Sequence, residues 1–451
     1  MIASRQLLCV VALYAAIQSC WLLTIPPFEG PDEFQHYDFV RYVAITGHLP
    51  DKIPAVVNEG DFFTGEWTQE GAYYWLLGLI LRQTGYQTMR PGEALVGNKH
   101  SMWLGGQAAN LHQHAAPLQY PIAGGLLIGR LASVLFGLGT LVSVFAAVRL
   151  VTADERIAAL ASSCVALVPQ FGYQHVLITN DTAATMWASI ASALIVWLLV
   201  RREAPSWPLG LAIGATTGLA IATKLTAGVI VVALPMAWWC RRGDGRQAWL
   251  RPAIAWVAGL LATAGVAFGR NWIIFGDPLA SALKHAVVAQ FDFRTVFNPR
   301  ELSSYGHLLY MLFRGTWASF GWGPWTPHQF WILTIFSVMT AFVLACVILA
   351  LRQRRTDATA VMLSVFALHC AAFLISISFF AGYSARYFLP LIVPFVVIVV
   401  AGAPRLCGMV RRRVGAEALR WMLVAVPLLL AAAWIGTLTA TLIAFHFEGL
   451  R

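Results

Sequence analysis

The residues best suited to chemistry lie in one short polar stretch, residues 26–38. Ten consecutive residues of this stretch hold four carboxylates and a histidine. Pro31 suits the first position of a helix, because its φ is already helical and its missing N–H would have no partner there. Asp32 and Glu33 would then occupy the first turn, where the helix dipole favours negative charge, and His36 would share a face with Asp32. Such a carboxylate can accept a proton, although acids in a first helical turn are also an ordinary structural feature.

Further charged side chains recur where later apolar segments are expected to end at the same membrane face. They are Arg130, His175 with Asp181, Lys224, Arg270, Arg314 and Arg386. Arginine is always charged and binds phosphate through two N–H groups at once, and a carboxylate can deprotonate an attacking hydroxyl. The set therefore suits a substrate that carries a lipid-linked phosphate.

Each of these residues also has a simpler interpretation. Asp181 follows Thr179 and could cap a helix N-terminus. Lys224 could anchor a turn at the membrane interface, and the three later arginines could extend to lipid headgroups. These structural alternatives stay open from the sequence.

Neither the cysteines nor the histidines predict a metal site. The seven cysteines lie within apolar runs or beside basic clusters, so a disulfide framework or a zinc site in the polar loops is not expected. His112 and His114 could bind a metal together, but no cysteine or regularly spaced acid accompanies them. We predict no metal and no cofactor, and a divalent cation is left open.

The composition indicates which elements position these residues. The 451 residues are 59% hydrophobic and 12% charged, with a mean hydropathy of +0.68, which is typical of a polytopic membrane protein. The basic residues form short clusters between apolar runs, as positive-inside topology requires. The net charge of +10 therefore does not indicate a nucleic-acid partner. These clusters are 201–202, 241–251, 352–355 and 405–420.

The apolar runs predict an all-α bundle of about eleven transmembrane helices, with the N-terminus inside and the C-terminus outside. The first run is long enough to span and lacks a cleavage site, so we predict a retained helix instead of a signal peptide. The predicted spans are 6–25, 131–149, 156–173, 182–200, 207–223, 225–240, 251–269, 329–351, 358–379, 387–403 and 421–444. One transmembrane domain, residues 1–451, with no separate soluble domain is expected.

Two large outward loops, residues 26–130 and 270–328, would carry the polar residues. The apolar piece 72–81 is too short to span and predicts an interfacial or re-entrant helix, with Tyr73, Tyr74 and Trp75 at headgroup level. A second surface helix is expected over 31–46. It would hold an apolar Phe39–Val43 pair and an ion pair between Asp38 and Arg41. Arg130 is placed at the outer surface, because a charge in hydrocarbon is costly.

The chain resembles the GT-C superfamily of integral-membrane glycosyltransferases, which use polyprenyl-phosphate sugars. That superfamily includes the protein O-mannosyltransferases and the lipid A aminoarabinose transferases, and the chain is most similar to a poorly characterised bacterial family of multi-pass membrane proteins. The resemblance rests on PPFEGPDEFQH (26–36), YYWLL (73–77), RLASVLFG (130–137), NDT (180–182), GLAIATKLTA (218–227), RNWIIFGDPL (270–279), FGW (320–322) and RYFLP (386–390). The chain departs from the family pattern at 69–74, where QEGAYY replaces PPLYY.

The resemblance implies roles for several residues. Asp32 would be the general base, with Glu33 as the second candidate, and Asp181 would help to form the site. Lys224, Arg270 and Arg386 would hold the lipid phosphate. His36, Tyr73, Tyr74, Arg130 and Arg314 complete the predicted substrate-binding set.

The expected function is transfer of a sugar from a polyprenyl-phosphate donor to a hydroxyl of a glycan, lipid or protein. It would take place at the periplasmic face of a bacterial inner membrane. A lipid or polysaccharide transporter is the main alternative, but carriers generally place charged residues near the membrane midplane, whereas these gather at one face. A glycan polymerase or ligase that uses a lipid-diphosphate donor is a second alternative.

Overall fold

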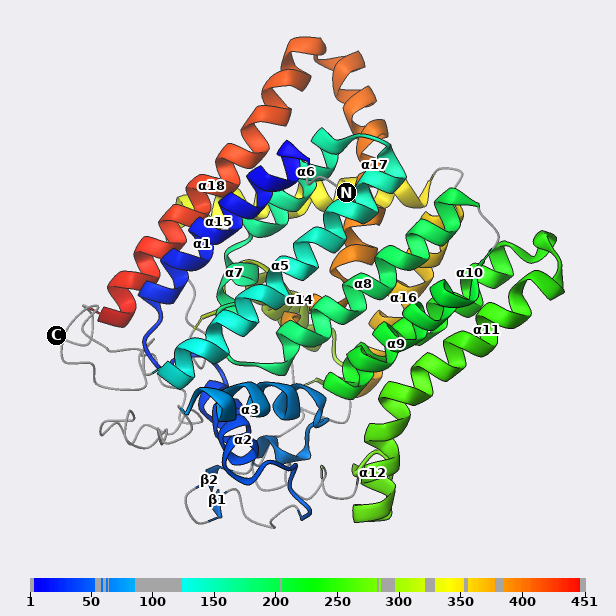
Figure 1. The fold of residues 1–451 in the computed structure, drawn as a ribbon. Coiled ribbons are helices and arrows are strands. Elements are labelled where there is room, and N and C mark those ends of the chain that lie inside the picture. The colour runs from blue at the N-terminus through cyan, green and yellow to red at the C-terminus, as the bar shows by residue number, and fades with distance from the viewer. Residues whose placement is uncertain are drawn as a thin grey trace.

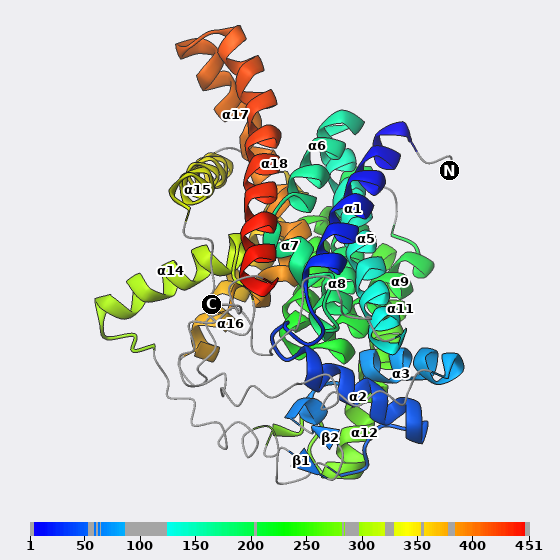
Figure 2. The same cartoon turned by 90° about the vertical axis from the view of Figure 1, so that its left-hand side faces the viewer.

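The protein is a helical bundle, seen here in a computed structural model that describes residues 4–52, 58–59, 62–63, 65–85, 124–202, 205–281, 284, 297–320, 329–352, 356–377 and 384–446. Besides helices and the turns and links between them, these ranges contain a short antiparallel strand pair, β1 (Asn58–Glu59) and β2 (Phe62–Phe63), with two residues in each strand. The long helices run side by side, and short helices lie across one end of the bundle (Figure 1 and Figure 2). The predicted all-α polytopic architecture is confirmed.

Eight helical segments among the described residues are long and apolar enough to cross a membrane. Two of them are built from more than one piece: α11 continues through the π-helical segment η4 into α12, and the 3₁₀ segment η5 leads into α17. Their bounds are α1 (Arg5–Thr24), α5 (Gly124–Thr152), α8 (Asn180–Arg201), α11 (Arg246–Leu260) with η4 (Leu261–Gly265) and α12 (Val266–Phe275), α15 (Phe330–Leu351), α16 (Asp357–Ile377), η5 (Ala385–Leu391) with α17 (Ile392–Arg413), and α18 (Ala416–His446).

The three other predicted spans are present as shorter helices. α9 (Trp207–Thr223), and η2 (Leu225–Val232) with α10 (Ala233–Cys240), follow the predicted bounds, and η3 (Arg242–Asp244) comes next. The span 156–173 is divided into α6 (Glu155–Ala166) and α7 (Pro169–Gln174). Proline disfavours helical backbone in the residue before it, and Val168 is extended with ψ 116°. The total of eleven spans therefore stays a prediction.

The short helices at one end of the bundle are α2 (Glu33–Thr46), η1 (Gly65–Thr68) and α3 (Ala72–Thr84). α2 and α3 pack closely: a Cβ on Gly78 would lie 2.6 Å from the Cβ of Val43. Both helices exist as predicted, but Tyr73 and Tyr74 are buried, and Trp75 is 48% exposed. Both tyrosines therefore lie on the face of α3 that packs against the protein, and their position at headgroup level stays a prediction.

The two ends of the bundle differ in charge. The helix ends that carry the described basic clusters 201–202, 241–251 and 405–420 lie at the end away from α2 and α3, as does the N-terminus of α1 (Figure 1). The α17–α18 hairpin extends furthest at that end and contains Arg411, Arg412 and Arg413. This arrangement agrees with positive-inside topology, and which end faces the cytoplasm stays a prediction.

Three of the helix boundaries that differ from the predicted ones concern residues of the predicted site. α2 begins at Glu33, so Pro31 lies outside the helix. α5 begins at Gly124, and this places Arg130 inside a helix and not before it. α12 continues to Phe275 and ends at Gly276, whose φ of 69° stops the helix, so Arg270 also lies within a helix.

Candidate active site

Asp32 is held at the tight link between α1 and α2. Its backbone is left-handed, with φ 61°, a conformation that aspartate tolerates better than most residues. It occupies the N-cap position of α2, but its side chain makes no capping hydrogen bond. Gly30 lets the link pack on the bundle, because a Cβ there would lie 2.5 Å from Leu177 Cδ1. The carboxylate of Asp32 is thereby turned away from its own helix.

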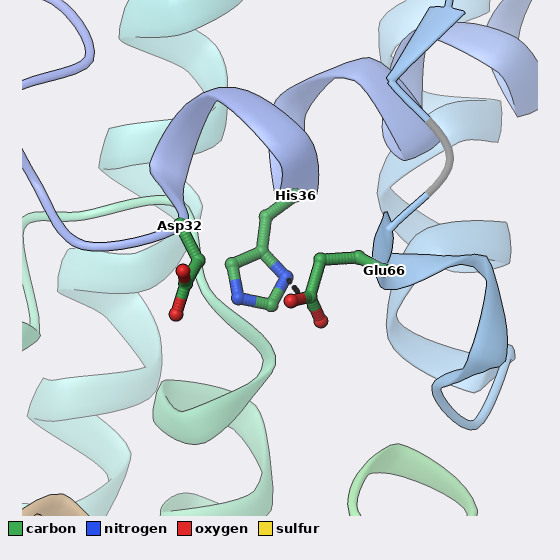
Figure 3. Close-up of side chains that lie close together, drawn as sticks. All are labelled: Asp32, His36 and Glu66. Carbon is green, nitrogen blue, oxygen red and sulfur yellow. Dashed lines mark ion pairs between the residues drawn. The ribbon is translucent and has the colours of Figure 1, made fainter. Parts of the chain in front are cut away.

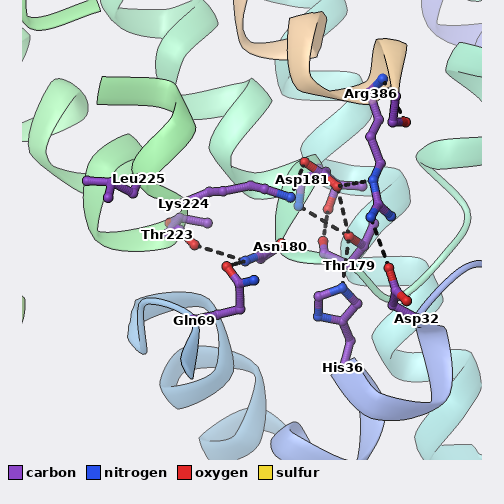
Figure 4. Close-up of polar contacts among 12 residues, drawn as sticks. Asp32, His36, Gln69, Thr179, Asn180, Asp181, Thr223, Lys224, Leu225 and Arg386 are labelled. Carbon is purple, nitrogen blue, oxygen red and sulfur yellow. Dashed lines mark hydrogen bonds and ion pairs between the residues drawn. The ribbon is translucent and has the colours of Figure 1, made fainter. Parts of the chain in front are cut away.

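Asp32 joins an acid–cation cluster, defined here as Asp32, Asp181, Lys224 and Arg386 (Figure 4). Arg386 Nη2 donates to Asp32 Oδ2 at 3.0 Å, and Arg386 Nε lies 4.0 Å from Asp181 Oδ2. Lys224 Nζ is 2.7 Å from Asp181 Oδ1. Residues from four separate elements thus form one chain of alternating charges, and all four were predicted to lie at a common membrane face.

Helix ends position the three cluster members that follow Asp32. Thr179 caps α8 by accepting a hydrogen bond from the Asp181 N–H at 3.3 Å, so Asp181 is not the cap and its carboxylate can face the cluster. Lys224 lies at the extended break between α9 and η2. Arg386 lies in the first turn of η5, where Tyr387 places its ring 5.5 Å from Lys224 Nζ and 5.8 Å from Arg386 Cζ.

Two members of the cluster are buried, and the other two are partly exposed. The Asp181 side chain is 1% exposed and that of Lys224 is 9% exposed, whereas Asp32 and Arg386 are 23% and 20% exposed. Arg386 Nε has no hydrogen-bond partner among the described residues. The arrangement therefore leaves Arg386 Nε free to donate a hydrogen bond to an anion. It also leaves one acid, Asp32, that a second substrate could approach.

His36 lies beside the cluster as a neutral imidazole. Burial, with Lys224 and Arg386 nearby, lowers the pKa of His36 to about 3 against the opposing effect of Asp32 and Asp181. Its Nδ1 is 2.7 Å from the Tyr74 hydroxyl, which keeps its proton because burial raises the pKa of Tyr74. We therefore assign Tyr74 as the donor and His36 Nδ1 as the acceptor.

Tyr73 and Tyr74 thus differ in position. Tyr74 lies next to the site: its hydroxyl hydrogen-bonds to His36, and the rings of Tyr74 and His36 stack with centroids 5.8 Å apart. The hydroxyl of Tyr73 is buried, and burial raises its pKa. Neither tyrosine contacts a member of the acid–cation cluster directly in the described structure, so their substrate contacts remain predictions.

Glu66 completes a group that the sequence did not single out. One side-chain atom that could bind a metal, from each of Asp32, His36 and Glu66, lies within 4.8 Å of the others (Figure 3). Such a set could hold a metal ion, but Arg386 already pairs with Asp32, and Tyr74 already donates to His36 Nδ1. The absence of a metal stays a prediction. The pair His112 and His114 lies outside the described residues.

Glu33 and Arg130 form a separate buried ion pair. Arg130 donates from Nε to Glu33 Oε1 at 2.8 Å and from Nη2 to Oε2 at 2.7 Å, and both side chains are fully buried. Arg130 also donates to the carbonyl oxygens of Ile25 and Pro26, and Glu33 accepts from the N–H groups of Phe28 and Ile178. Arg130 is thus buried within α5 and does not precede that helix, and this pairing offsets the cost of its burial. Its level in the membrane stays a prediction. With its acceptors occupied, Glu33 serves as a structural anchor.

Arg270 and Arg314 do not join the cluster in the structure. Arg270 donates to the carbonyl oxygen of Pro50, and its guanidinium lies 5.8 Å from the ring of Phe275. Arg314 lies in the last turn of α14 (Leu302–Trp317), where it is buried and stacks on Tyr310 at 5.3 Å. Neither is shown in contact with a cluster member, so their predicted binding of phosphate gains no support.

Glu70 is another residue that sequence reasoning missed. Its Oε2 accepts from the N–H of Leu225 at 3.1 Å, and its Oε1 accepts from Lys284 Nζ at 2.6 Å. It therefore ties the segment before α3 to the break that carries Lys224 and to the segment after α12. Glu70 lies within 69–74, where the sequence departs from the family pattern, and that departure was the signal that could have found it.

Comparisons with known proteins concern the sequence and the fold of the chain. A family model described as dolichyl-phosphate-mannose-protein mannosyltransferase matches residues 123–269, which run from α5 into α12. A search of curated proteins finds no match.

Solved structures share the fold over nearly the whole chain. ArnT from Cupriavidus metallidurans, bound to undecaprenyl phosphate, is 16% identical with a TM-score of 0.54, over 97% of this chain and 76% of that one. The archaeal oligosaccharyltransferase AglB from Archaeoglobus fulgidus, in complex with an inhibitory peptide and a dolichol-phosphate, is 15% identical with a TM-score of 0.52. That match covers 98% of this chain and 56% of AglB, so the chain spans little more than half of that protein. The chain therefore shares the fold of these solved structures.

Proposed function

We propose that this protein is a membrane glycosyltransferase that moves a sugar from a polyprenyl-phosphate donor to a hydroxyl acceptor. One observation carries the proposal: Asp32 at 3.0 Å from Arg386, and Asp181 at 2.7 Å from Lys224, form one cluster at a single end of the bundle. A proton acceptor therefore lies beside two cations that can bind phosphate.

The charges of the cluster suit such a donor. Its two carboxylates balance its two cations, so the deep part of the site is neutral before substrate binds. A sugar linked through phosphate to a polyprenyl chain carries one negative charge. Arg386 Nε, which lacks a hydrogen-bond partner in the described structure, and Lys224 Nζ would donate to its oxygens.

The reaction requires three coupled changes. The acceptor oxygen bonds to the anomeric carbon from the side opposite the phosphate, which inverts its configuration. The bond between that carbon and the phosphate oxygen breaks, and Asp32 takes the acceptor's proton. Lys224 and Arg386 stabilise the charge that grows on the departing phosphate. Phosphate is a good leaving group, so no covalent enzyme intermediate is needed.

The comparisons support the class of donor. ArnT is seen with undecaprenyl phosphate, and AglB is seen with dolichol-phosphate. By analogy, the donor here would carry a polyprenyl chain, and the acceptor would be a glycan, a lipid or a protein. The site would face the periplasm from a bacterial inner membrane, because α2 and α3 lie opposite the basic turns (Figure 1).

The test is transfer by the purified protein in liposomes that contain polyprenyl-phosphate sugars. Asp32→Asn keeps the shape of the side chain but removes the proton acceptor, and we expect transfer to fall about 10²- to 10⁴-fold while donor binding persists. Asp357→Asn is the matched control, because Asp357 lies in an exposed ion pair with Arg202. An unchanged transfer rate in Asp32→Asn would reject the assigned base.

A further inference from the structure

Glu66 has a carboxyl oxygen that the protein leaves unused. Glu66 lies in η1, between α2 and α3, and its side chain is 15% exposed. Its Oε2 is buried and has no hydrogen-bond partner among the described residues. That atom lies 3.8 Å from His36 Nδ1, too far for a hydrogen bond, and Nδ1 already accepts from Tyr74. A buried polar atom without a partner is costly unless a ligand satisfies it.

The surroundings of Glu66 favour its neutral form. The charged groups that act on it are Asp32, Asp181, Lys224 and Arg386, and the uncharged titratable groups nearby are His36 and Tyr74. Burial and the negative charge of Asp32 raise the pKa of Glu66 to about 8, against the opposing effect of the two cations. At neutral pH its carboxyl group therefore holds a proton and can donate a hydrogen bond.

We propose that Glu66 is a further substrate-binding residue, whose protonated carboxyl group donates a hydrogen bond to an oxygen of the polyprenyl-phosphate-linked donor. The proposal rests on the glycosyl transfer proposed above. Two neighbouring acids then have different roles, since Asp32, paired with Arg386, accepts the acceptor's proton, whereas Glu66 keeps its own.

The charge balance explains why the proton matters. The acid–cation cluster is neutral, so an ionised Glu66 would give the site a negative charge before the anionic donor arrives. Loss of the proton would also replace a donor by an acceptor, which repels the phosphate oxygens. Donor binding should therefore weaken as Glu66 ionises.

The experiment measures the dissociation constant of polyprenyl phosphate for the purified protein between pH 6.5 and 9.5. Both ionisations of a phosphate monoester are complete near pH 8, so the ligand hardly titrates above that value. We expect wild-type affinity to fall by up to about tenfold per pH unit above pH 8, as loss of one proton requires. This measurement on the wild type needs no variant that folds differently.

Variants show whether the alkaline loss of affinity comes from Glu66. Glu66→Gln, a permanently neutral donor, should bind within about threefold of wild type at pH 7 and lose the alkaline decline. Glu66→Ala should bind about fivefold more weakly at pH 7, the usual effect of one hydrogen bond. Glu155→Gln, which alters a surface ion pair with Arg149, is the matched control and should keep the wild-type profile.

The outcomes separate the two proposals. If wild type binds no polyprenyl phosphate at any pH, the proposed function fails. If wild type binds but Glu66→Gln shows the same alkaline decline, the role of Glu66 is wrong and the proposed function stands. Binding that a chelator abolishes, together with a bound metal that Glu66→Gln loses, would overturn the role as well, because Glu66 would then be an ionised ligand.

Discussion

At the scale of residues, Arg386 connects the two carboxylates of the candidate site. It donates to Asp32 and lies 4.0 Å from Asp181, which in turn pairs with Lys224. Arg386 thus balances the charge of Asp32 and presents donors to an incoming anion. A lysine would suit both tasks less well, because its charge is compact and its donors all lie on one nitrogen, whereas the guanidinium spreads its donors over a planar fork.

Substitution of Arg386 should therefore act mainly on donor binding. Arg386→Gln is expected to weaken binding of polyprenyl phosphate roughly 10- to 100-fold, since hydrogen bonds to charged groups contribute about 1.5–3 kcal/mol. The dissociation constant is measured in detergent at fixed ionic strength, with Arg149→Gln as the control. Equal affinity in Arg386→Gln and wild type would remove this residue from the phosphate site.

Sequence reasoning found the cluster but not its full surroundings. Asp32, Asp181, Lys224 and Arg386 could be predicted because each is a charged residue at the end of an apolar run. Glu66 could not, since a lone acid in a polar loop carries no periodic signal. Arg270 and Arg314 have the same local pattern as Arg386, and only the tertiary packing separates them.

At the scale of elements, the Glu33–Arg130 pair fixes α2 against α5. Glu33 begins α2, and Arg130 lies in the second turn of α5 and also holds two carbonyl oxygens of the link from α1. The link therefore cannot shift without breaking buried hydrogen bonds. This anchor holds the left-handed backbone of Asp32 in place, directly next to Glu33.

Breaking this pair should destabilise the protein strongly. Glu33→Gln leaves Arg130 as an uncompensated buried charge, a change that typically costs about 3–5 kcal/mol. We expect a clear drop of the midpoint temperature in a thermal-unfolding measurement in detergent. Glu155→Gln breaks the exposed pair with Arg149 and should cost no more than about 1 kcal/mol.

Similar shifts for both substitutions would contradict the assigned anchoring role. Loss of transfer by Glu33→Gln at a temperature where it stays folded would instead restore Glu33 as a catalytic candidate. The sequence could not distinguish these roles, because the helix that carries Arg130 was predicted to start at residue 131, whereas α5 begins at Gly124.

At the scale of the whole molecule, the bundle separates basic turns from the acid–cation cluster. Hydropathy predicted the long helices because a span needs about 20 apolar residues whatever its neighbours. It did not predict the break before Pro169, since the apolar run continues through it. The break separates α7 from α6. The Tyr173 hydroxyl of α7 donates to the carbonyl oxygen of Glu29 in the link from α1.

The fold brings together residues that lie far apart in the chain. Asp32 and Arg386 meet although 354 positions separate them, because the link after α1 and the start of η5 both lie at the side of the bundle that α2 and α3 cover. Glu70 adds a second connection there through Leu225 and Lys284. The architecture thus assembles one site from several helix ends.

The most direct test of this account is an experimental structure of the protein with bound polyprenyl phosphate. We expect phosphate oxygens within about 3 Å of Lys224 Nζ and the Arg386 guanidinium, with the Asp32 carboxylate facing the space that the transferred sugar and the acceptor hydroxyl would occupy. A phosphate bound elsewhere, with the Asp32–Arg386 pair enclosed and out of reach of the ligand, would contradict it.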